Sequence, residues 1–525
     1  MVIPYLASPS AINLKTSLIL ANLLTTFCRG KVKSYLNAYQ ILISMIQRNL
    51  VKLGVFLILL SGCMANSITK VSEPRLRVSE NKRYLEYQDG TPFFWLGGTS
   101  WGMAEWLNRE DVIHYLDNRK EKEFSVVQIC LFWGKREEDP VSFTLNPANA
   151  YGYKAFEELN GIPSPKRPAL ADGGTPTEPN DYWDHVDFII EEAAKRDMMI
   201  ALLPVWGRRY VNISETSSAE TFFTPESMKF YGNFLGARYR ENDHIIWVLG
   251  GDVKADDGGD YLPYYRAMAE GILTGVTDKI VAWNEPSPLW DKMLMTYHPD
   301  GAPFLNSSTW FHTDPWLDFN MVETFKNRET VYRAIANDYE LESPVKPTVM
   351  AEPDYEGVKP NSETAGVHMR RQAFHSYFAG AAGFTYGGKF DADGNGPLWS
   401  PYQGWKNMLD MEGARTMRNI KKFCLENGWP HWVPDNSLLK GETATGELQI
   451  VAVKDSSSSS YHVYFPENRQ LVLDVASVNS NNLQIQWYNP QTGRYTGKRK
   501  VTPKQNQLLL NPPDGWSDAV LLLKY

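Results

Sequence analysis

Two carboxylates each stand at the end of a short apolar run of the sequence. Asp252 ends the run His-Ile-Ile-Trp-Val-Leu-Gly-Gly-Asp, and Glu352 ends the run Pro-Thr-Val-Met-Ala-Glu. Acidic residues just past buried parallel strands converge at one mouth of a barrel, and a converging carboxyl pair is what glycoside cleavage needs. We therefore expect Asp252 and Glu352 to be catalytic. Structural carboxylates held by basic residues at a barrel rim are the alternative.

Other carboxyls in the sequence could be mistaken for members of this pair. Asp354 and Glu356 lie further along the loop that follows Glu352, and this position predicts solvated side chains. An Asn-Glu pair that ends at Glu285 imitates the pair that follows the fourth strand in many barrel glycosidases. Here it precedes the run expected to form the fifth strand, so we expect Glu285 to have no catalytic role.

Residues that follow the other expected strands would form the walls of a pocket around the acids. Aromatic residues make up 13% of the chain and include 17 Trp, more than a core alone usually requires. Sugar rings present apolar C–H faces that stack on aromatic rings, so this surplus favours a carbohydrate cleft, with core packing as the alternative for each residue singly. Arg208 or Arg209 is expected to pair with a carboxylate of an acidic substrate. The expected substrate-binding residues are Trp101, Trp133, Trp206, Arg208, His298, Glu323 and Tyr386.

The histidines, cysteines and acidic runs of the sequence decide whether a metal or cofactor site is expected. The nine histidines form no His-Glu-x-x-His motif, and no Cys/His set has the spacing of a zinc site. Residues 391–395 begin like a calcium loop, but Tyr402 stands where the bidentate Glu would be. We therefore expect no metal and no cofactor, with an acidic turn at residues 391–395 and calcium binding there as the alternative.

The first 62 residues have the composition of an export leader. Arg48 and Lys52 precede residues 53–60, an apolar stretch too short to span a bilayer, and Cys63 follows Leu-Ser-Gly. The segment resembles the lipobox of bacterial lipoproteins, which implies a signal peptide at residues 45–62 and lipidation of Cys63. We expect a protein that is lipid-anchored in the bacterial cell envelope, with the membrane face open and a transmembrane anchor as the alternative.

The charge balance and the cysteine content limit the partners. Because residues 1–62 hold six basic side chains and no acidic ones, the net charge of −8 becomes −14 without them. A chain this acidic is a poor partner for nucleic acid. The expected partner is an oligo- or polysaccharide, with membrane contact through the lipid anchor only and a monomeric protein. Only Cys130 and Cys424 remain once Cys63 is acylated, so no disulfide framework is predicted.

Eight strand-like runs alternate with helical patterns after a short hairpin. This alternation predicts a (β/α)8 TIM barrel at residues 76–432, after a linker at residues 63–75. An open doubly wound sheet is the alternative, but no Gly-rich nucleotide turn follows the first strand. The expected strands are residues 92–96, 125–132, 198–205, 244–249, 293–297, 317–322, 347–351 and 382–386. The expected helices are residues 109–122, 182–196, 224–241, 261–273, 331–339 and 365–379.

The pattern changes after about residue 432 to short alternating strands joined by turns. Such a pattern predicts a small antiparallel β-sandwich at residues 433–525. Its expected strands are residues 448–453, 461–465, 470–475, 483–487, 507–510 and 519–523.

Several short motifs together resemble the apiosidase-type glycoside hydrolases of family 140. They are Phe-Phe-Trp-Leu-Gly-Gly-Thr-Ser-Trp ending at Trp101, Leu-Gly-Gly-Asp ending at Asp252, Met-Thr-Tyr-His-Pro around His298, Ala-Glu ending at Glu352, and Gly-Phe-Thr-Tyr-Gly around Tyr386. Further on, Gln-Trp-Tyr-Asn-Pro-Gln-Thr-Gly, residues 486–493, resembles a small sandwich labelled as collagen-binding that follows such barrels. The sequence differs from many relatives at Gly98, where they carry a polar residue, and at residues 280–290, which look like an insertion.

This resemblance implies a retaining mechanism with assigned roles for the two acids. Glu352 would be the nucleophile, and Asp252 would be the acid/base that protonates the leaving oxygen. The implied substrate is the pectic polysaccharide rhamnogalacturonan-II, from which apiose would be released. A barrel glycosidase of other specificity and a glycan-binding lipoprotein without catalysis are the alternatives.

Overall fold

The computed structural model describes residues 75–133, 144–211, 222–301, 304–325, 327–357, 365–388, 405–478 and 482–525. All of them lie within one compact unit, Ser72–Tyr525. The expected leader, the lipidated Cys63 and the acidic turn at residues 391–395 lie outside these ranges. Among the helices in these ranges, none has the length and apolar character needed to cross a membrane.

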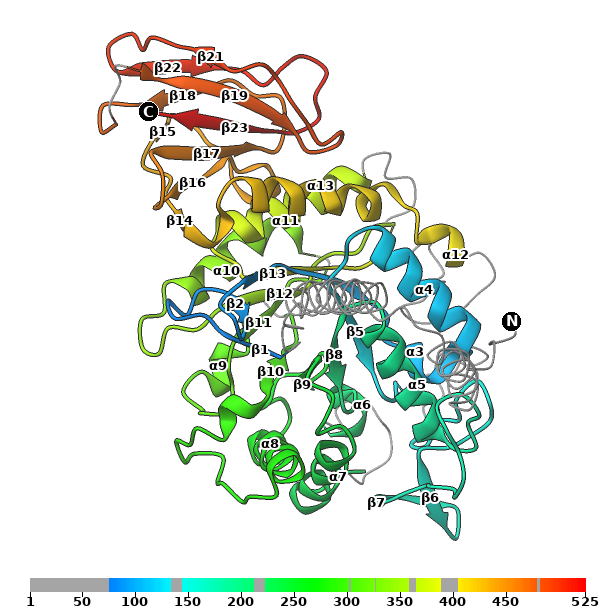
Figure 1. The fold of residues 1–525 in the computed structure, drawn as a ribbon. Coiled ribbons are helices and arrows are strands. Elements are labelled where there is room, and N and C mark those ends of the chain that lie inside the picture. Colours follow the sequence, from blue (N-terminus) through cyan, green and yellow to red (C-terminus); the bar gives the residue numbers. More distant parts are fainter. Residues whose placement is uncertain are drawn as a thin grey trace, which may run out of the picture. The chain divides into compact units, whose positions relative to one another are not determined.

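Eight parallel strands form the barrel, in the hydrogen-bonded order β10-β9-β8-β5-β4-β13-β12-β11 (Figure 1). Strands β10 and β11, at the two ends of this order, are joined by individual hydrogen bonds. The amide of Asp318 donates to the carbonyl of Met295 (2.9 Å), and the Thr296 hydroxyl donates to the carbonyl of Phe319 (2.6 Å). Every residue of these strands is buried, as expected for parallel strands covered by helices. The predicted barrel is thus confirmed. Its strands are β4 (Trp95–Thr99), β5 (Val126–Cys130), β8 (Met199–Leu203), β9 (Ile245–Gly250), β10 (Leu294–His298), β11 (Asn320–Glu323), β12 (Thr348–Glu352) and β13 (Gly383–Tyr386).

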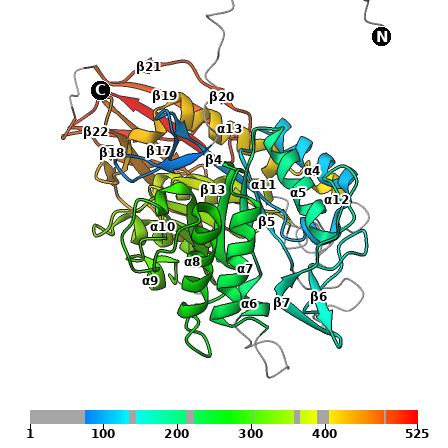
Figure 2. The same ribbon diagram turned by 60° about the horizontal axis from the view of Figure 1, so that its bottom comes forward.

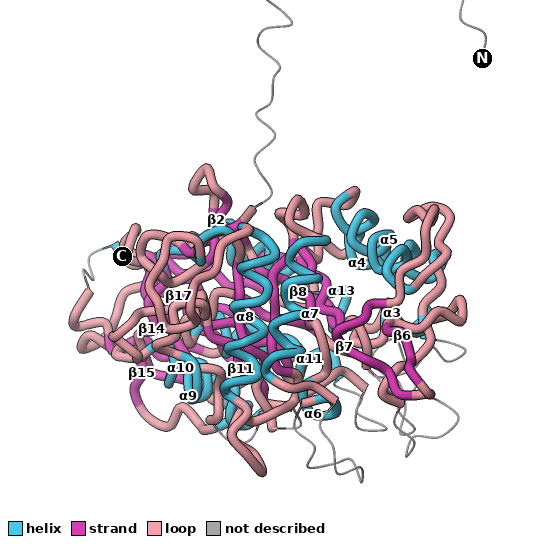
Figure 3. Tube along the Cα trace, turned by 90° about the horizontal axis from the view of Figure 1, so that it is seen from below, coloured by secondary structure: helices cyan, strands magenta, loops and turns pink. Residues whose placement is uncertain are grey.

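Helices surround these strands, as Figures 2 and 3 show from two further directions. Their starts follow local sequence signals: the Asp181 carboxylate caps α5, and Thr224 and Ser227 form a capping box at α7. The longer helices are α4 (Arg109–Glu121), α5 (Tyr182–Ala194), α7 (Pro225–Arg238), α8 (Leu262–Thr277), α10 (Val331–Tyr339), α11 (Ala365–Phe378) and α13 (Glu412–Glu426). Short helical turns are α3 (Met103–Trp106), α6 (Gly207–Tyr210), α9 (Ser308–Phe311), α12 (Trp405–Met408), η2 (Trp290–Lys292), η3 (Arg328–Thr330), η4 (Trp429–His431) and η5 (Gly446–Leu448).

Helix α13, the β6–β7 hairpin and the short helical turns of the barrel region were not predicted. Helix α13 buries Met417, Ile420 and Phe423 at helical spacing, a signal that the sequence does contain. The hairpin of β6 (Phe156–Leu159) and β7 (Ile162–Pro168) is harder to predict, because its second strand carries three prolines and prolines count against a strand. A second small sheet, expected as a hairpin, pairs β1 (Leu76–Val78), β2 (Leu85–Tyr87) and β3 (Pro92–Phe93), so the run expected as the first barrel strand, residues 92–96, is divided between β3 and β4.

Two antiparallel sheets form the C-terminal part of the chain. One runs β14-β16-β17-β23-β19-β20 with β21 beside β19, and the other runs β15-β18-β22. Along β17, Tyr461, Val463 and Phe465 enter the core between the sheets. His462 and Tyr464 point the other way, where Phe374 of α11 stacks on Tyr464. The strands are β14 (Trp432–Pro434), β15 (Leu439–Lys440), β16 (Val451–Asp455), β17 (Ser460–Phe465), β18 (Leu471–Asp474), β19 (Gln484–Asn489), β20 (Arg494–Tyr495), β21 (Arg499–Lys500), β22 (Gln507–Leu510) and β23 (Ala519–Lys524).

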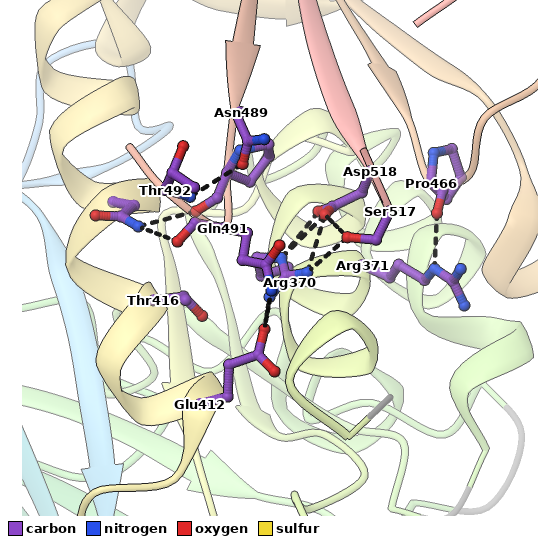
Figure 4. A network of polar contacts seen from close by, with 12 residues as sticks. Arg370, Arg371, Glu412, Thr416, Pro466, Asn489, Gln491, Thr492, Ser517 and Asp518 are labelled. Carbon is purple, nitrogen blue, oxygen red and sulfur yellow. Dashed lines mark hydrogen bonds and ion pairs between the residues drawn. The ribbon is translucent and has the colours of Figure 1, made fainter. Parts of the chain in front are cut away.

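A buried ion pair joins the barrel to the sandwich (Figure 4). The guanidinium of Arg370, on α11, contacts the Asp518 carboxylate at 3.0 Å, and the two side chains are 1% and 0% exposed. Arg370 also pairs with Glu412 at the start of α13 (2.7 Å) and donates to the Ser517 hydroxyl (3.1 Å). Because each charge has an opposite charge and hydrogen bonds, the sandwich is held in a defined position on α11 and α13.

Candidate active site

Four ionisable side chains converge at the carboxyl ends of neighbouring barrel strands. Asp252 follows β9, His298 ends β10, Glu323 ends β11 and Glu352 ends β12, and each offers one ligand atom within 4.8 Å of the others. We call these residues the quartet. The side chains of His298, Glu352 and Glu323 are 0%, 3% and 6% exposed, whereas that of Asp252 is 24% exposed. Asp252 is therefore the member that water and a leaving group can reach most easily.

An unusual backbone turn aims Asp252 toward the other three residues. Gly250 and Gly251 have φ values of 88° and 114°, and Asp252 itself has a φ of 46°. A Cβ atom on Gly250 would lie 2.3 Å from the His298 carbonyl oxygen, and one on Gly251 would lie 2.9 Å from the Trp206 ring. Left-handed geometry at a non-glycine residue costs roughly 1–3 kcal/mol and is concentrated at functional sites. Only residues without a Cβ atom fit at positions 250 and 251, so the two glycines before Asp252 permit this turn.

Glu352 is oriented by a short chain of hydrogen-bond donors. The Tyr355 hydroxyl donates to Oε1 of Glu352, and the indole nitrogen of Trp101 donates to the Tyr355 oxygen at 3.1 Å. Oε2 of Glu352 faces the Nε2 atom of His298 at 3.2 Å. Tyr355 was not predicted as a site residue, and its position three residues after Glu352 is the only sequence signal for it.

Glu323 lies beside Glu352 because of an irregularity in strand pairing. The register between β11 and β12 shifts after Val322, so that Glu323 pairs with Glu352. A bulge of this kind redirects a side chain at the end of a strand. Both carboxyls therefore point to the same side of the barrel mouth.

The protonation of His298 follows from its hydrogen-bonding geometry. Its Nδ1 atom lies 3.1 Å from the carbonyl oxygen of Pro299, which can only accept, so we assign a proton to Nδ1. Burial lowers the pKa of His298, so the neutral ring is favoured, with the lone pair of Nε2 facing Glu352. Two acceptors that face each other at 3.2 Å are stable only when a proton lies between them. The geometry therefore favours a protonated carboxyl in the unliganded quartet.

Burial and mutual repulsion raise the pKa values of the three carboxyls. Burial, followed by the negative charge of Glu352, raises the pKa of Asp252 to about 8, against the opposing effects of His298 and Arg208. Burial raises the pKa of Glu352 to about 7, although hydrogen bonds from Tyr355, Asp252 and Trp101 oppose it. The pKa of Glu323 is also raised well above its usual value, mainly by burial. The three carboxyls therefore titrate together, at higher pH than free carboxyls do.

Three indole rings lie against the quartet. Trp133 and Trp206 have ring centroids 4.1 Å apart, and those of Trp101 and Trp206 are 4.8 Å apart. The His298 ring lies 5.3 Å from Trp101 and 6.1 Å from Trp206. All three indoles are almost fully buried by the described residues, so they support the quartet as well as forming its wall.

The two neighbouring arginines have different surroundings. Arg209 stacks on Trp133, 4.2 Å from its centroid, and donates to the carbonyl oxygen of the same residue at 2.6 Å. The charge of Arg208 lowers the pKa of Asp252, and the charge of Asp252 also acts on Arg209, whose side chain is held by Trp133. Of the two, Arg208 is therefore the better candidate for contact with an acidic substrate.

Asp354 and Glu356 are not solvated, contrary to the prediction, since each is 3% exposed. Glu356 accepts hydrogen bonds from the Tyr386 hydroxyl (2.6 Å) and from the amide of Gly413 (2.8 Å). The backbone amide of Asp354 donates to the side chain of Gln372 at 2.9 Å. Buried donors on other elements thus hold the loop that follows Glu352, and the Tyr386 hydroxyl is directed to this loop.

The side chain of Arg328 links the loop after Glu352 to the C-terminal part of the chain. Its Nε atom lies 3.5 Å from the carboxylate of Asp354 and 3.5 Å from that of Glu447. Glu447 belongs to η5, which precedes the first long strand of the sandwich. The position of the loop therefore depends on residues from both regions.

Two other candidate groups do not belong to the quartet. Glu285 is exposed and precedes β10, so it lies at the amino end of that strand, whereas His298 lies at the carboxyl end. Ser100 stands in Gly-Thr-Ser-Trp-Gly, residues 98–102, which has the Gly-x-Ser-x-Gly spacing of acyl-transfer enzymes. Ser100 is fully buried and directly follows β4, apart from the four strand ends that carry the quartet.

Comparison with known proteins agrees with this geometry. Residues 79–431 match the family profile described as the apiosidase-like catalytic domain, and residues 433–524 match one described as a collagen-binding domain of a collagenase. A solved structure named "Glycoside hydrolase" has a TM-score of 0.68 and 27% identity, covering 86% of this chain and 96% of its own. A glycoside hydrolase family 5 structure from Bacteroides vulgatus has a TM-score of 0.67 and 26% identity, with 86% and 93% covered.

No curated protein matches the sequence. The family profile nevertheless spans most of the chain and includes all four quartet residues. The chain therefore belongs to the apiosidase-like family and is a glycoside hydrolase.

Proposed function

We propose that this glycoside hydrolase cleaves its substrate with retention of configuration, with Glu352 as the nucleophile and Asp252 as the acid/base. The observation that carries the proposal is the convergence of the quartet, whose ligand atoms lie within 4.8 Å of one another. Retaining enzymes keep their two carboxyls about 5–5.5 Å apart, whereas inverting enzymes need about 6.5–9.5 Å to admit a water. The short separation supports direct attack by a carboxylate.

In the first step, an oxygen of ionised Glu352 bonds to the anomeric carbon while the glycosidic C–O bond breaks. The proton of Asp252 moves to the departing oxygen, so that the leaving group departs neutral. Tyr355, itself held by Trp101, occupies Oε1 of Glu352, so Oε2, which faces His298 at 3.2 Å, is the attacking atom once it has lost its proton.

In the second step, ionised Asp252 takes a proton from a water molecule whose oxygen attacks the anomeric carbon. The bond to Glu352 breaks, and its carboxylate is restored. The negative charge of Glu352 contributes to the raised pKa of Asp252, and this charge is absent in the ester intermediate. Asp252 therefore becomes more acidic between the two steps, which suits its change from acid to base.

The proposed substrate is the pectic polysaccharide rhamnogalacturonan-II, with apiose as the released sugar. The apiosidase-like family match supports this class of substrate. Arg208 supplies a positive charge beside Asp252, which suits a polysaccharide that carries carboxylates.

Product analysis with fractionated plant pectins tests this proposal. The expected products are free apiose and, by NMR during the first minutes, the sugar anomer with the configuration of the substrate bond. Binding without sugar release would contradict hydrolysis, and release of the opposite anomer would contradict retention.

Chelation separates this mechanism from one that needs a metal. The quartet has the ligand types and spacing that could hold a divalent cation. The carboxylate mechanism predicts the same rate after dialysis against EDTA. Loss of activity that a divalent cation restores would assign the quartet to a metal instead.

We also propose that Cys63 anchors the protein to the bacterial envelope through a lipid. The basic and apolar run before it, followed by Leu-Ser-Gly-Cys, supports this proposal. Cys63→Ala should move the protein from the membrane pellet to the soluble fraction without loss of hydrolysis. A variant that stays in the pellet would contradict the anchor.

A further inference from the structure

A cavity of about 310 Å³ lies where the end of α13 meets the larger sheet of the sandwich. Figure 1 shows α13 next to the sheet that holds β17, β23 and β19. Small-molecule sites have volumes of about 300–1,000 Å³ and are common at domain boundaries. We call this space the α13 cavity. Its lining shares no residue with the quartet.

The floor of the α13 cavity is a grid of side chains from three adjacent strands. Leu522 pairs with His462 on one side and with Gln486 on the other, and two residues along the same face Lys524 pairs with Ser460 and Gln484. Neighbouring strands lie about 4.8 Å apart, and side chains on one face repeat about every 7 Å. The grid thus brings several hydrogen-bonding side chains together on one face of the sheet. Its members are Ser460, His462, Gln484, Gln486, Leu522 and Lys524.

His462 is buried in this floor with unsatisfied hydrogen-bonding capacity. It is 3% exposed, and its ring lies 5.2 Å from Trp432 and 5.8 Å from Phe423. Neither ring nitrogen makes a hydrogen bond of normal geometry with a described residue, although the Asn427 backbone lies near enough to affect its pKa. A buried polar group without partners loses its hydrogen bonds to water, so a ligand that supplied partners would bind favourably.

The protonation of His462 determines what it can bind. Burial lowers its pKa to about 4, which keeps the ring neutral near pH 7. A neutral imidazole has one donor and one acceptor nitrogen. This combination matches a hydroxyl group, which also donates and accepts.

The charged groups around the cavity balance one another. Asp455 and Glu426 bring two negative charges, and Lys498 and Lys524 bring two positive charges. Hydrogen bonds from Ser458 and Ser457 outweigh burial and lower the pKa of Asp455, so it is an ionised acceptor. A site with no net charge and many hydrogen-bonding groups favours a neutral polyol over an anion.

We infer that the α13 cavity is a second saccharide site that binds one neutral sugar unit of a glycan. The half-exposed side chain of Leu522 would contact the apolar C–H face, and the grid would bind the hydroxyls. The buried pair of Arg370 and Asp518 fixes the sandwich on the barrel, so this site keeps a constant distance from the quartet. The inference goes beyond the proposed hydrolysis and does not depend on it.

Binding measurements on the full chain with Glu352→Gln test this inference without turnover. L-Rhamnose, D-galactose and D-galacturonic acid would be titrated while the ring-proton NMR signals of the histidines are followed, with His462 assigned by loss of its signal in His462→Gln. We expect L-rhamnose or D-galactose to shift the His462 signals. If neither neutral sugar shifts them, or if the acid binds more tightly than both, the inference is overturned.

Rim variants keep the test valid if His462→Gln does not fold. Gln484→Ala with Lys524→Ala should weaken binding of the neutral sugar at this site by at least about tenfold. The matched control is Gln470→Ala, an exposed glutamine of the same sandwich that does not line the cavity. Equal binding in the rim variant and the control would contradict the site. Hydrolysis by the same rim variant with Glu352 intact should be unchanged on a small aryl glycoside, which separates this result from the proposed function.

Discussion

Buried charges occur both at the barrel–sandwich junction and at the barrel mouth, but they are balanced in different ways. At the junction, Arg370 contacts Asp518 and Glu412, so opposite charges meet. At the mouth, Glu323 and Glu352 lie with Asp252 around a histidine whose pKa is lowered. The first arrangement stabilises ionised groups, and the second favours their protonated forms.

This difference separates a structural function from a chemical one. The pKa of Arg370 is raised, so its guanidinium at the junction remains charged at any physiological pH. The pKa values of Asp252 and Glu352 lie at about 8 and about 7, where a small change in surroundings moves a proton. Substitutions at the mouth should therefore change rates and pH profiles, whereas substitutions at the junction should change stability.

The largest effect is expected from Glu352→Gln. The amide keeps the shape of the side chain but cannot form the glycosyl intermediate, so kcat should fall by at least about three orders of magnitude, which is about 4 kcal/mol of barrier. Initial rates on any cleaved substrate measure the loss. The melting temperature should not fall, because the variant removes a charge from a crowded group of carboxyls. If the variant kept more than about a tenth of the normal kcat, the assignment of Glu352 as the nucleophile would be wrong.

The next effect is expected at the junction. Asp518→Ala leaves the guanidinium of Arg370 buried with only Glu412 as a charged partner and should lower the free energy of unfolding by about 3–5 kcal/mol. Urea denaturation measures this change. The matched control is Lys120→Ala, which breaks an exposed pair with Asp197 and should cost less than about 1 kcal/mol. Similar losses in both variants would contradict a special role for the buried pair.

A smaller effect on rate, with a defined shift in pH, is expected from Tyr355→Phe. The Tyr355 hydroxyl donates to Glu352 and favours its ionised form, so its removal should raise the pKa of Glu352 above about 7. Because Glu352 must be ionised to attack, the acidic limb of the kcat/KM profile should move to higher pH. Tyr386→Phe is the control, since its hydroxyl donates to Glu356 instead. Equal profiles for the two variants would contradict the assignment.

The smallest effect is expected from Arg208→Ala. Removing this positive charge should raise the pKa of Asp252 and move the basic limb of kcat/KM to higher pH, because Asp252 must be protonated in the first step. Cleavage of acidic substrates should weaken more than cleavage of neutral ones. Arg415→Ala, at an exposed position on α13, is the control. Equal losses on acidic and neutral substrates would contradict contact between Arg208 and a carboxylate.

Most of the site residues could be predicted because they lie at the ends of strands that the sequence indicates. Asp252 and Glu352 end apolar runs, and in a parallel barrel such ends meet at one mouth, so their approach follows from periodicity alone. The same argument placed His298 and Glu323 nearby, and all four lie in the quartet. The sequence indicated eight barrel strands and six of the longer helices because apolar residues recur with different periods in strands and in amphipathic helices.

Contacts between distant segments could not be predicted in the same way. Asp354 and Glu356 looked solvated because nothing near them in sequence pairs with a carboxylate, but Arg328, Tyr386 and Gly413 reach them from other elements. Tyr355 was missed because its function depends on a rotamer that brings it back to Glu352. The α13 cavity was missed because His462 faces it only through the pairing of three strands.

The most direct test of the central claim is the behaviour of Asp252→Ala with added azide. On a substrate with a good leaving group, little protonation is needed, so the glycosyl-enzyme should form and accumulate. Azide should then restore turnover and give a glycosyl azide with the configuration of the substrate, whereas Glu285→Ala should stay within about tenfold of the unmodified rate. A near-normal rate for Asp252→Ala, with azide rescue in Glu285→Ala instead, would contradict the assignment of Asp252 as the acid/base.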